Sequence, residues 1–239
     1  LENTSVYASL PSSLMLSQLS TNSGAVNGDY ATIPRGVPLG IATYDGDSGT
    51  DERSIFVADP LNATIWRVVN KGGVAVVKNI RGDFPSVFFG DCMDGPGTFA
   101  TWGAPMDVAV DQSGNVYVAD AWCHSIRVIK DAGFGQDLDG LVGSLRGFVA
   151  SNQSRISAEA AQRIENNLRL ADTEFLDDNR YMVTTLAGSP DGQPGFADGP
   201  AALARFNSPT SIAIASTGDG TVIFVADTGN RRIRRIVVP

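Results

Sequence analysis

The chain has 239 residues, of which 43% are hydrophobic and 18% are charged, and it contains 26 glycines. This composition is typical of one turn-rich globular domain, and no apolar run approaches the roughly 18 residues that a membrane span needs. Eighteen basic against 26 acidic residues give a net charge of −8. Because a negative surface repels phosphate groups, the charge disfavours nucleic-acid binding.

The N-terminal segment, residues 1–26, contains one strand-like stretch, SVYASLP from Ser5, and the glycosylation sequon at Asn3. Its first residue, Leu1, is not a start methionine, and no signal peptide is present. We therefore expect either a processed mature chain or a piece of a longer polypeptide.

One supersecondary unit then occurs three times. The copies are IFVADPLNATIWRVV from Ile55, VYVADAWCHSIRVIK from Val116 and IFVADTGNRRIRRIV from Ile223. A second matching run precedes each copy: PLGIA from Pro38, PMDVA from Pro105 and PTSIA from Pro209. A repeat of fixed pattern decides the fold class, because each copy forms the same supersecondary structure.

Each copy is predicted to form four antiparallel strands. The proline run, the run that ends in Val-Ala-Asp and the run after the next turn are the first three, and GGVAVVKNI from Gly72 or MVTTLAGS from Met182 is the fourth. In the third strand the apolar residues lie three apart, as at Ile126 and Ile129. Regular strands alternate every two residues, so this spacing predicts a bulge or a strong twist. Four such strands in roughly 40–50 residues are typical of a propeller blade.

Linkers of one length precede the copies: DGPGTFATWGAP from Asp94, DGPAALARFNSP from Asp198 and NGDYATIPRGVP from Asn27. With the third copy, FADGPAALARFNSPTSIAIA…VIFVADTGNRRIRRI, this pattern resembles the NHL-repeat family of β-propellers over residues 27–130 and 183–239. The resemblance implies an all-β propeller of four-stranded blades and says little about function. The chain departs from the motif at Pro60 and Leu61 in the first copy and at Ala121, Trp122 and Cys123 in the second.

Three blades are legible, at residues 27–80, 92–190 and 196–239. The second contains an insertion, residues 131–181, in which an apolar stripe after Ser157 predicts one amphipathic α-helix of about five turns. The stripe consists of Ala161, Ile164, Leu168, Ala171 and Phe175. This helix is expected to pack on its own propeller or, alternatively, to dock on a partner. The stretch GFGQDLDG before it is expected to be a polar loop.

The number of blades predicts association. Propellers close with roughly four to eight blades, and repeat units expose apolar faces at their ends unless something caps them. The third blade stops at Val238 after three strands, and the stretch at Ser5 is a candidate for its fourth. We therefore expect a homo- or hetero-oligomer, or the remainder of a longer polypeptide, to supply the missing blades.

The two cysteines lie where the repeat brings two turns to the same end of a blade. Cys92 lies two residues before the linker at Asp94, and Cys123 lies in the turn between the second and third strands. This placement predicts a Cys92–Cys123 disulfide and hence an oxidising compartment; two buried thiols are the alternative. Sequons favour the same extracellular or cell-surface location, and they stand at Asn3, Asn62 and Asn152.

Candidate catalytic groups are few. His124 is the only histidine, so a serine triad or a histidine-rich metal site lacks its residues. The acidic turn between Asp45 and Glu52 fails the spacing of a calcium loop. We therefore expect no enzyme activity, no metal and no cofactor. The alternative is a propeller-fold hydrolase or lyase whose active site is completed by blades outside this chain.

The turns after Asp59, Asp120 and Asp227 form a candidate binding rim, and the three aspartates are expected to cap backbone amides there. The rim residues are Trp122, His124, Arg231 and Arg232. Exposed loop aromatics are enriched at interfaces, although Trp122 folded onto the linker at Cys92 and solvated arginines are the alternative. The sequence predicts an extracellular binding and assembly module that contacts other protein chains in a larger surface or fibrous structure. RNA binding through the arginines is a weaker alternative.

Overall fold

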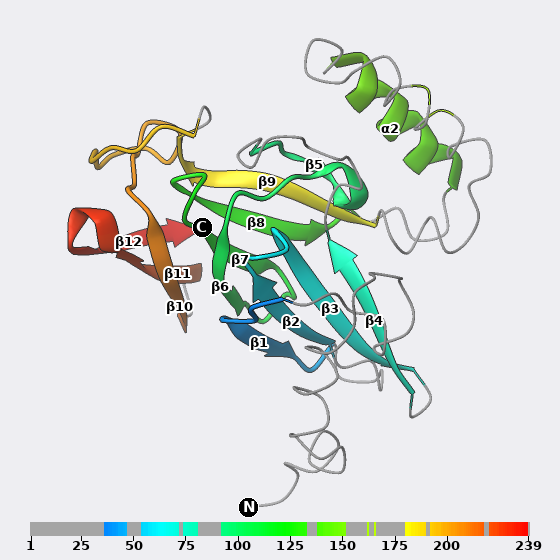
Figure 1. The fold of residues 1–239 in the computed structure, drawn as a ribbon, viewed down its shortest axis with the longest axis horizontal. Coiled ribbons are helices and arrows are strands. Elements are labelled where there is room, and N and C mark those ends of the chain that lie inside the picture. The colour runs from blue at the N-terminus through cyan, green and yellow to red at the C-terminus, as the bar shows by residue number, and fades with distance from the viewer. Residues whose placement is uncertain are drawn as a thin grey trace, which may run out of the picture.

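The computed structural model of the protein describes residues 36–46, 54–71, 74–80, 92–132, 138–151, 162, 165, 180–189, 192–217 and 220–238. Across these residues the chain forms three antiparallel sheets and a helix, α2 (Figure 1). The predicted strand at Ser5, the sequons at Asn3 and Asn152 and most of the helix predicted after Ser157 lie outside the described residues. Within that predicted helix Gln162 and Glu165 are described, and both are helical.

Sheet 1 has the four-stranded unit that the repeat predicts. Its strands pair in the order β1-β2-β3-β4, with bounds β1 (Ile41–Tyr44), β2 (Ser54–Asp59), β3 (Thr64–Lys71) and β4 (Val74–Ile80). The β-branched and aromatic residues of β2 suit a strand that is buried on both faces, and all six of its residues are buried.

Sheet 2 has the same four strands and one more. The order is β5-β9-β8-β7-β6, with β5 (Gly95–Pro96), β6 (Pro105–Val110), β7 (Val116–Asp120), β8 (Ser125–Asp131) and β9 (Tyr181–Gly188). The additional strand β5 belongs to the linker, where Gly95 pairs with Val183 and Pro96 with Met182. A single-turn 3-10 helix, η2 (Gly97–Phe99), follows it.

Sheet 3 has three strands, as the pattern at the end of the sequence predicts. β10 (Pro209–Thr217), β11 (Gly220–Asp227) and β12 (Arg232–Val238) pair in that order, and η3 (Thr228–Asn230) forms the turn before β12. In Figure 1, sheet 2 lies between sheet 1, in blue and cyan, and sheet 3, in orange and red.

The bulge predicted for the third strands is wrong for β3 and β12. Both strands pair residue for residue with β2 and β11. In sheet 2 the register shifts between Ile126 and Arg127, but the additional residue is Leu186 on the neighbouring strand β9. In β8, apolar residues can lie three apart because the strand is buried on both faces over Ser125–Ile129, so alternation is not required.

Two hydrophobic clusters join the sheets in succession. The first contains Phe56 and Ile65 of sheet 1 together with Val116 and Val183 of sheet 2. The second contains residues of sheets 2 and 3, including Tyr117, Ile126, Ile223 and Val225. The linkers contribute to both clusters, because Trp102 lies in the first cluster and Phe206 at the equivalent position lies in the second. The Trp102 indole donates to the Ile80 carbonyl at 2.6 Å.

The insertion begins with a helix that the sequence pattern did not predict. α2 (Leu138–Ser151) includes the end of the stretch that was expected to be a polar loop. Leu145 is buried, and the Phe148 ring packs edge-on against Phe99 of η2 with the centroids 5.9 Å apart. α2 therefore packs back on the linker beside sheet 2. Among the helices described, none has the length and apolar character that crossing a membrane requires.

Candidate binding rim

Each turn of the candidate rim begins at a buried aspartate that ends the second strand of its repeat. Asp59, Asp120 and Asp227 are 2%, 0% and 0% exposed. The Asp120 carboxylate accepts hydrogen bonds from the backbone amides of Gly103, at 3.1 Å, and Ala104, at 2.9 Å. Asp59 accepts from the amides of Val37 and Asn62, and Asp227 accepts from that of Asn207. The predicted amide caps are confirmed, and each also holds the linker that precedes its sheet.

Each of these carboxylates contacts a side chain that stands seven residues later in the chain, an arginine in two repeats and a tryptophan in one. The guanidinium of Arg127 lies 3.6 Å from Asp120 Oδ2, and Arg234 Nη1 lies 3.0 Å from Asp227 Oδ2. In the first repeat the Trp66 indole replaces the arginine and donates to Asp59 Oδ2 at 3.0 Å. The arginines from Arg231 to Arg235 were expected to be solvated and to face neighbouring carboxylates. Arg234 does face Asp227, but its side chain is buried, at 8% exposed, rather than solvated.

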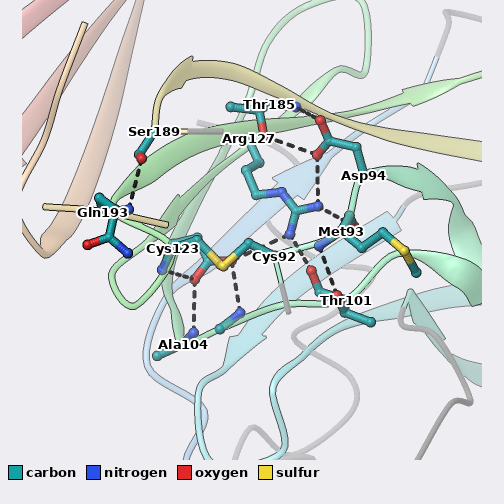
Figure 2. Close-up of a disulfide and its surroundings, with 12 residues drawn as sticks. Cys92, Met93, Asp94, Thr101, Ala104, Cys123, Arg127, Thr185, Ser189 and Gln193 are labelled. Carbon is teal, nitrogen blue, oxygen red and sulfur yellow. Dashed lines mark hydrogen bonds and ion pairs between the residues drawn. A yellow bond between two sulfur atoms is a disulfide. The ribbon is translucent and has the colours of Figure 1, made fainter. Parts of the chain in front are cut away.

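The two arginines also bind the linkers in the same way, and we call each one an arginine clamp. Arg127 Nη2 donates to the Met93 carbonyl at 2.7 Å and to Asp94 Oδ1 at 2.9 Å, and Nη1 donates to the Thr101 carbonyl (Figure 2). Its guanidinium carbon lies 4.6 Å from the centroid of the Trp102 ring. Arg234 repeats this arrangement with the Ala197 and Arg205 carbonyls, the Asp198 carboxylate and the Phe206 ring.

A disulfide replaces one hydrogen bond of the repeat. Three residues after the aspartate, the side-chain amides of Asn62 and Asn230 donate to their own Asp59 and Asp227 at 2.7 and 2.8 Å. The second repeat has Cys123 at this position, and it is bonded to Cys92 of the linker with a Cα–Cα distance of 5.7 Å (Figure 2). The predicted disulfide is confirmed. All three turns are thus closed, two by an amide and one by a covalent bond.

The sequon at Asn62 does not lie at an exposed tip of its turn. Its side chain is half-buried, because the amide nitrogen turns inward to donate to Asp59 Oδ2. Residues at the second position of the turns project instead: Trp122 is 62% exposed and Leu61 is 57% exposed. The indole of Trp122 is therefore on the surface rather than folded onto the linker at Cys92.

The other rim residues are divided between sheets 2 and 3. His124 has a φ of 50°, and its Nδ1 accepts the backbone amide of Ser208 at 2.9 Å, so it bridges sheet 2 and the start of sheet 3. Arg231 lies in the equivalent turn of sheet 3 and Arg232 begins β12, and both are exposed. The Arg232 guanidinium stacks on the Phe196 ring at 4.8 Å from the centroid.

We expect the stability of the protein to decrease as the pH falls below neutrality, because of His124. Burial lowers the pKa of His124 below its ordinary value of 6.5, an effect that the charges of Asp120 and Asp227 oppose. The unfolded chain therefore binds a proton at a higher pH than the folded chain, and the free energy of unfolding falls from about pH 6.5 downward until the folded histidine titrates. Urea unfolding at a series of pH values between about 5 and 7.5 measures this decline.

The matched control for this prediction is His124→Asn, which keeps an acceptor beside the Ser208 amide and tolerates positive φ. This variant should lose the pH dependence in that interval, because no other histidine exists in the chain. A decline of the same size in both proteins would contradict the assignment to His124.

One polar contact between the sheets was missed by sequence reasoning. Asp107 in β6 accepts hydrogen bonds from the Ser211 hydroxyl at 2.7 Å and the Ile212 amide at 3.0 Å, both in β10. The signal was available, because Asp107 and Ser211 hold the same position in successive repeats. Within the part of the chain that the structure describes, no group of three or more His, Cys, Asp or Glu residues is placed to hold a metal ion.

Comparison with known proteins gives no family. No protein-family model matches the chain, and no curated protein matches it either. Solved structures do match. A Bacteroides thetaiotaomicron protein of unknown function is 18% identical over 78% of this chain and 32% of its own, with a TM-score of 0.47. Auxiliary nutrient binding proteins from B. thetaiotaomicron and Bacteroides ovatus are 19% and 20% identical, cover 76% and 77% of this chain and 34% of their own, and have TM-scores of 0.45 and 0.44. The chain thus spans about a third of their length.

Proposed function

We propose that this chain is a segment of an NHL-type β-propeller that works as an extracellular binding and assembly module rather than as an enzyme. Sheets 1 to 3 are its three blades. Support comes from the repeated construction, in which a buried aspartate, its donor seven residues later and the aromatic residue of the linker recur from sheet to sheet. Such repeats form a rigid scaffold, and the residues of its turns are available to contact other protein chains.

The single observation that carries the binding role is the exposure of Trp122 on a turn that cannot move freely. The adjacent Cys123 is fixed by the disulfide and by a hydrogen bond from its amide to Asp120, while the neighbouring Trp122 is 62% exposed. A large exposed aromatic on a preorganised turn contributes contact area at little entropic cost. We therefore assign Trp122 as the anchor of a protein–protein contact.

The extracellular or cell-surface location rests on the disulfide. Disulfides persist in oxidising compartments and are rare in the cytosol, and the Cys92–Cys123 bond closes a turn of the central sheet. The sequons at Asn3 and Asn152 agree with this location, and their occupancy by glycans stays a prediction. The third sequon, at Asn62, does not add support, because its side-chain amide donates to Asp59.

Co-purification tests the binding role. The tagged chain would be isolated without reductant from the cells that produce it, and the accompanying proteins quantified by mass spectrometry for wild type, Trp122→Ser and Leu203→Ser. Leu203 is 65% exposed and serves as the matched control. We expect wild type and Leu203→Ser to retain one or more partner chains. The recovered amount of these partners should be roughly 30-fold lower with Trp122→Ser, as for an interface hot spot. Equal recovery with all three proteins would contradict the proposal.

A further inference from the structure

The turns of sheets 1 and 2 each carry a large exposed apolar side chain at the tip. Leu61 and Trp122 stand at the second position after the capping aspartate and are 57% and 62% exposed. The equivalent residue in sheet 3 is Gly229. Sheets 1 and 2 both contain all four strands of the repeat, so an incomplete sheet is not the reason for this exposure. We call Leu61 and Trp122 the tip pair.

The residue at the tip is coupled to the tenth residue of the preceding linker, because the two positions share one space. In sheet 3 a Cβ atom on Gly229 would lie 2.5 Å from Asn207 Cγ. In sheet 2 the glycine is on the linker side instead, where a Cβ atom on Gly103 would lie 2.8 Å from Trp122 Cβ. Sheet 1 also has a glycine, Gly36, at this linker position. A large tip residue therefore goes with a linker glycine, and the chain has this combination twice.

The spacing of the two sheets indicates what can contact both tips at once. Sheets 1 and 2 pack face to face through the first hydrophobic cluster, and packed sheets lie about 10 Å apart. In an α-helix, residues seven apart are separated by about 10.5 Å along the axis and point to the same side. An extended segment covers about 10 Å in about three residues, and its side chains then point to opposite sides. The tip pair therefore fits residues i and i+7 of one helix.

The charge of the turns specifies the polar part of such a helix. In the three turns, which the structure describes completely, the only acidic residues are the capping aspartates, and these are buried. Arg231 and Arg232, at the turn of sheet 3, are exposed. The exposed carboxylate of Asp198 in the linker is paired with Arg234. The turns are thus apolar and basic on a chain whose net charge is −8, and complementary charge favours an acidic partner.

We infer that the tip pair binds one acidic amphipathic helix of a partner protein, with two apolar residues seven positions apart on Leu61 and Trp122 and carboxylates directed towards Arg231. This inference rests on the proposed binding role of Trp122 and specifies the partner. The contact removes apolar surface from water on turns that are already ordered. Carboxylates of the helix form charge-assisted hydrogen bonds with the Arg231 guanidinium.

Photocrosslinking tests the inference. Photoreactive benzoylphenylalanine replaces Leu61 or Trp122 in the full tagged chain, which is illuminated without reductant among the cells that produce it. Mass spectrometry then identifies the crosslinked residues. We expect both positions to crosslink one partner chain at residues about seven positions apart, in a segment rich in Asp and Glu. Leu203, which is 65% exposed in a linker, carries the crosslinker in the control and should not give this product.

A peptide with the sequence of the crosslinked segment then measures the contribution of each residue. Its dissociation constant is determined by fluorescence anisotropy for wild type, Leu61→Ser, Arg231→Asn and Leu203→Ser. Asparagine tolerates the positive φ of 54° at Arg231. We expect Kd to rise roughly tenfold for Leu61→Ser and for Arg231→Asn, as for residues that contribute to an interface, and to stay unchanged for Leu203→Ser.

Crosslinks from the two tips to different chains, or to residues whose spacing is far from seven, would overturn the inference. So would a product with RNA or with a second copy of this chain, because either is a different occupant. A crosslink from Trp122 alone would overturn it and leave the proposed binding role intact. Failure of both positions to crosslink any protein would contradict the binding role as well.

Discussion

Replacement of Arg127 by methionine should destabilise the protein by about 3–5 kcal/mol, which is typical when one partner of a buried ion pair is removed. The side chains of Arg127 and Asp120 are both 0% exposed, so the substitution leaves a buried carboxylate without its cation. It also removes the donors to the Met93 and Thr101 carbonyls. The linker and sheet 2 would lose the clamp that holds them together, and urea unfolding followed by tryptophan fluorescence would measure the loss.

Arg146→Met is the control for this experiment. Arg146 forms an ion pair with Glu165, at 3.0 Å, but on the surface, where its side chain is 53% exposed. Exposed pairs contribute little because water screens them, so we expect no measurable change. The double variant Asp120→Asn/Arg127→Met should recover part of the stability, since the uncompensated charge is gone. An Arg127→Met protein as stable as Arg146→Met would contradict the role assigned to the clamp.

Loss of the disulfide is the second large effect that we expect. Cys92 and Cys123 are 31 residues apart in the sequence, and closing a loop of that length restricts the unfolded chain by about 3–4 kcal/mol in the chain-entropy treatment. The variant Cys92→Ser/Cys123→Ser should therefore be less stable than wild type by that order. Its turn also loses the link between Cys123 and the segment before the linker, which in the third repeat is made instead by the Asn230 amide, a donor to the Gly195 carbonyl at 2.8 Å.

The other repeats supply a matched variant. Cys92→Ser/Cys123→Asn places at position 123 the residue that closes the turns of sheets 1 and 3, and its amide can donate to Asp120 as Asn62 does to Asp59. We expect this variant to be more stable than Cys92→Ser/Cys123→Ser by about 1 kcal/mol, the usual contribution of one hydrogen bond. Equal unfolding midpoints for the two variants would show that the turn of sheet 2 does not accept the asparagine geometry.

Much of the sheet structure could be predicted from the sequence because its pattern recurs from repeat to repeat. The order of strands, the capping aspartates and the proximity of Cys92 to Cys123 follow from patterns that appear three times, so each copy checks the others. The interpretation failed where a residue depends on a distant segment. Arg234 looked like a solvated member of a basic run, yet Asp198 and the Ala197 carbonyl, more than 30 residues earlier, hold it in the interior.

Two further elements had weak local signals. β5 is a Gly-Pro pair, and both residues disfavour strands, so only its partner β9 makes it one. α2 contains Gly143 and Gly147, which lower helix propensity. The predicted polar loop GFGQDLDG covers only its first three residues, and no element was predicted for the rest of it. The turns after Asp59, Asp120 and Asp227 could be placed from the sequence. Which of their residues point outward depends on the hydrogen bonds of these aspartates, which no single position reveals.

The insertion in sheet 2 lies between the paired strands β8 and β9, and its position shows where a repeat of this kind can gain residues. The hairpin of β8 and β9 is open between Asp131 and Tyr181, whereas the equivalent hairpin of sheet 1 turns between Lys71 and Val74. The clamp and the disulfide act at the other end of these strands, near Ser125 and Gly188. Loop closure costs only about 0.6 kcal/mol for each doubling of loop length. New sequence can therefore enter at this end at little thermodynamic cost, while the end that carries the clamp keeps its register.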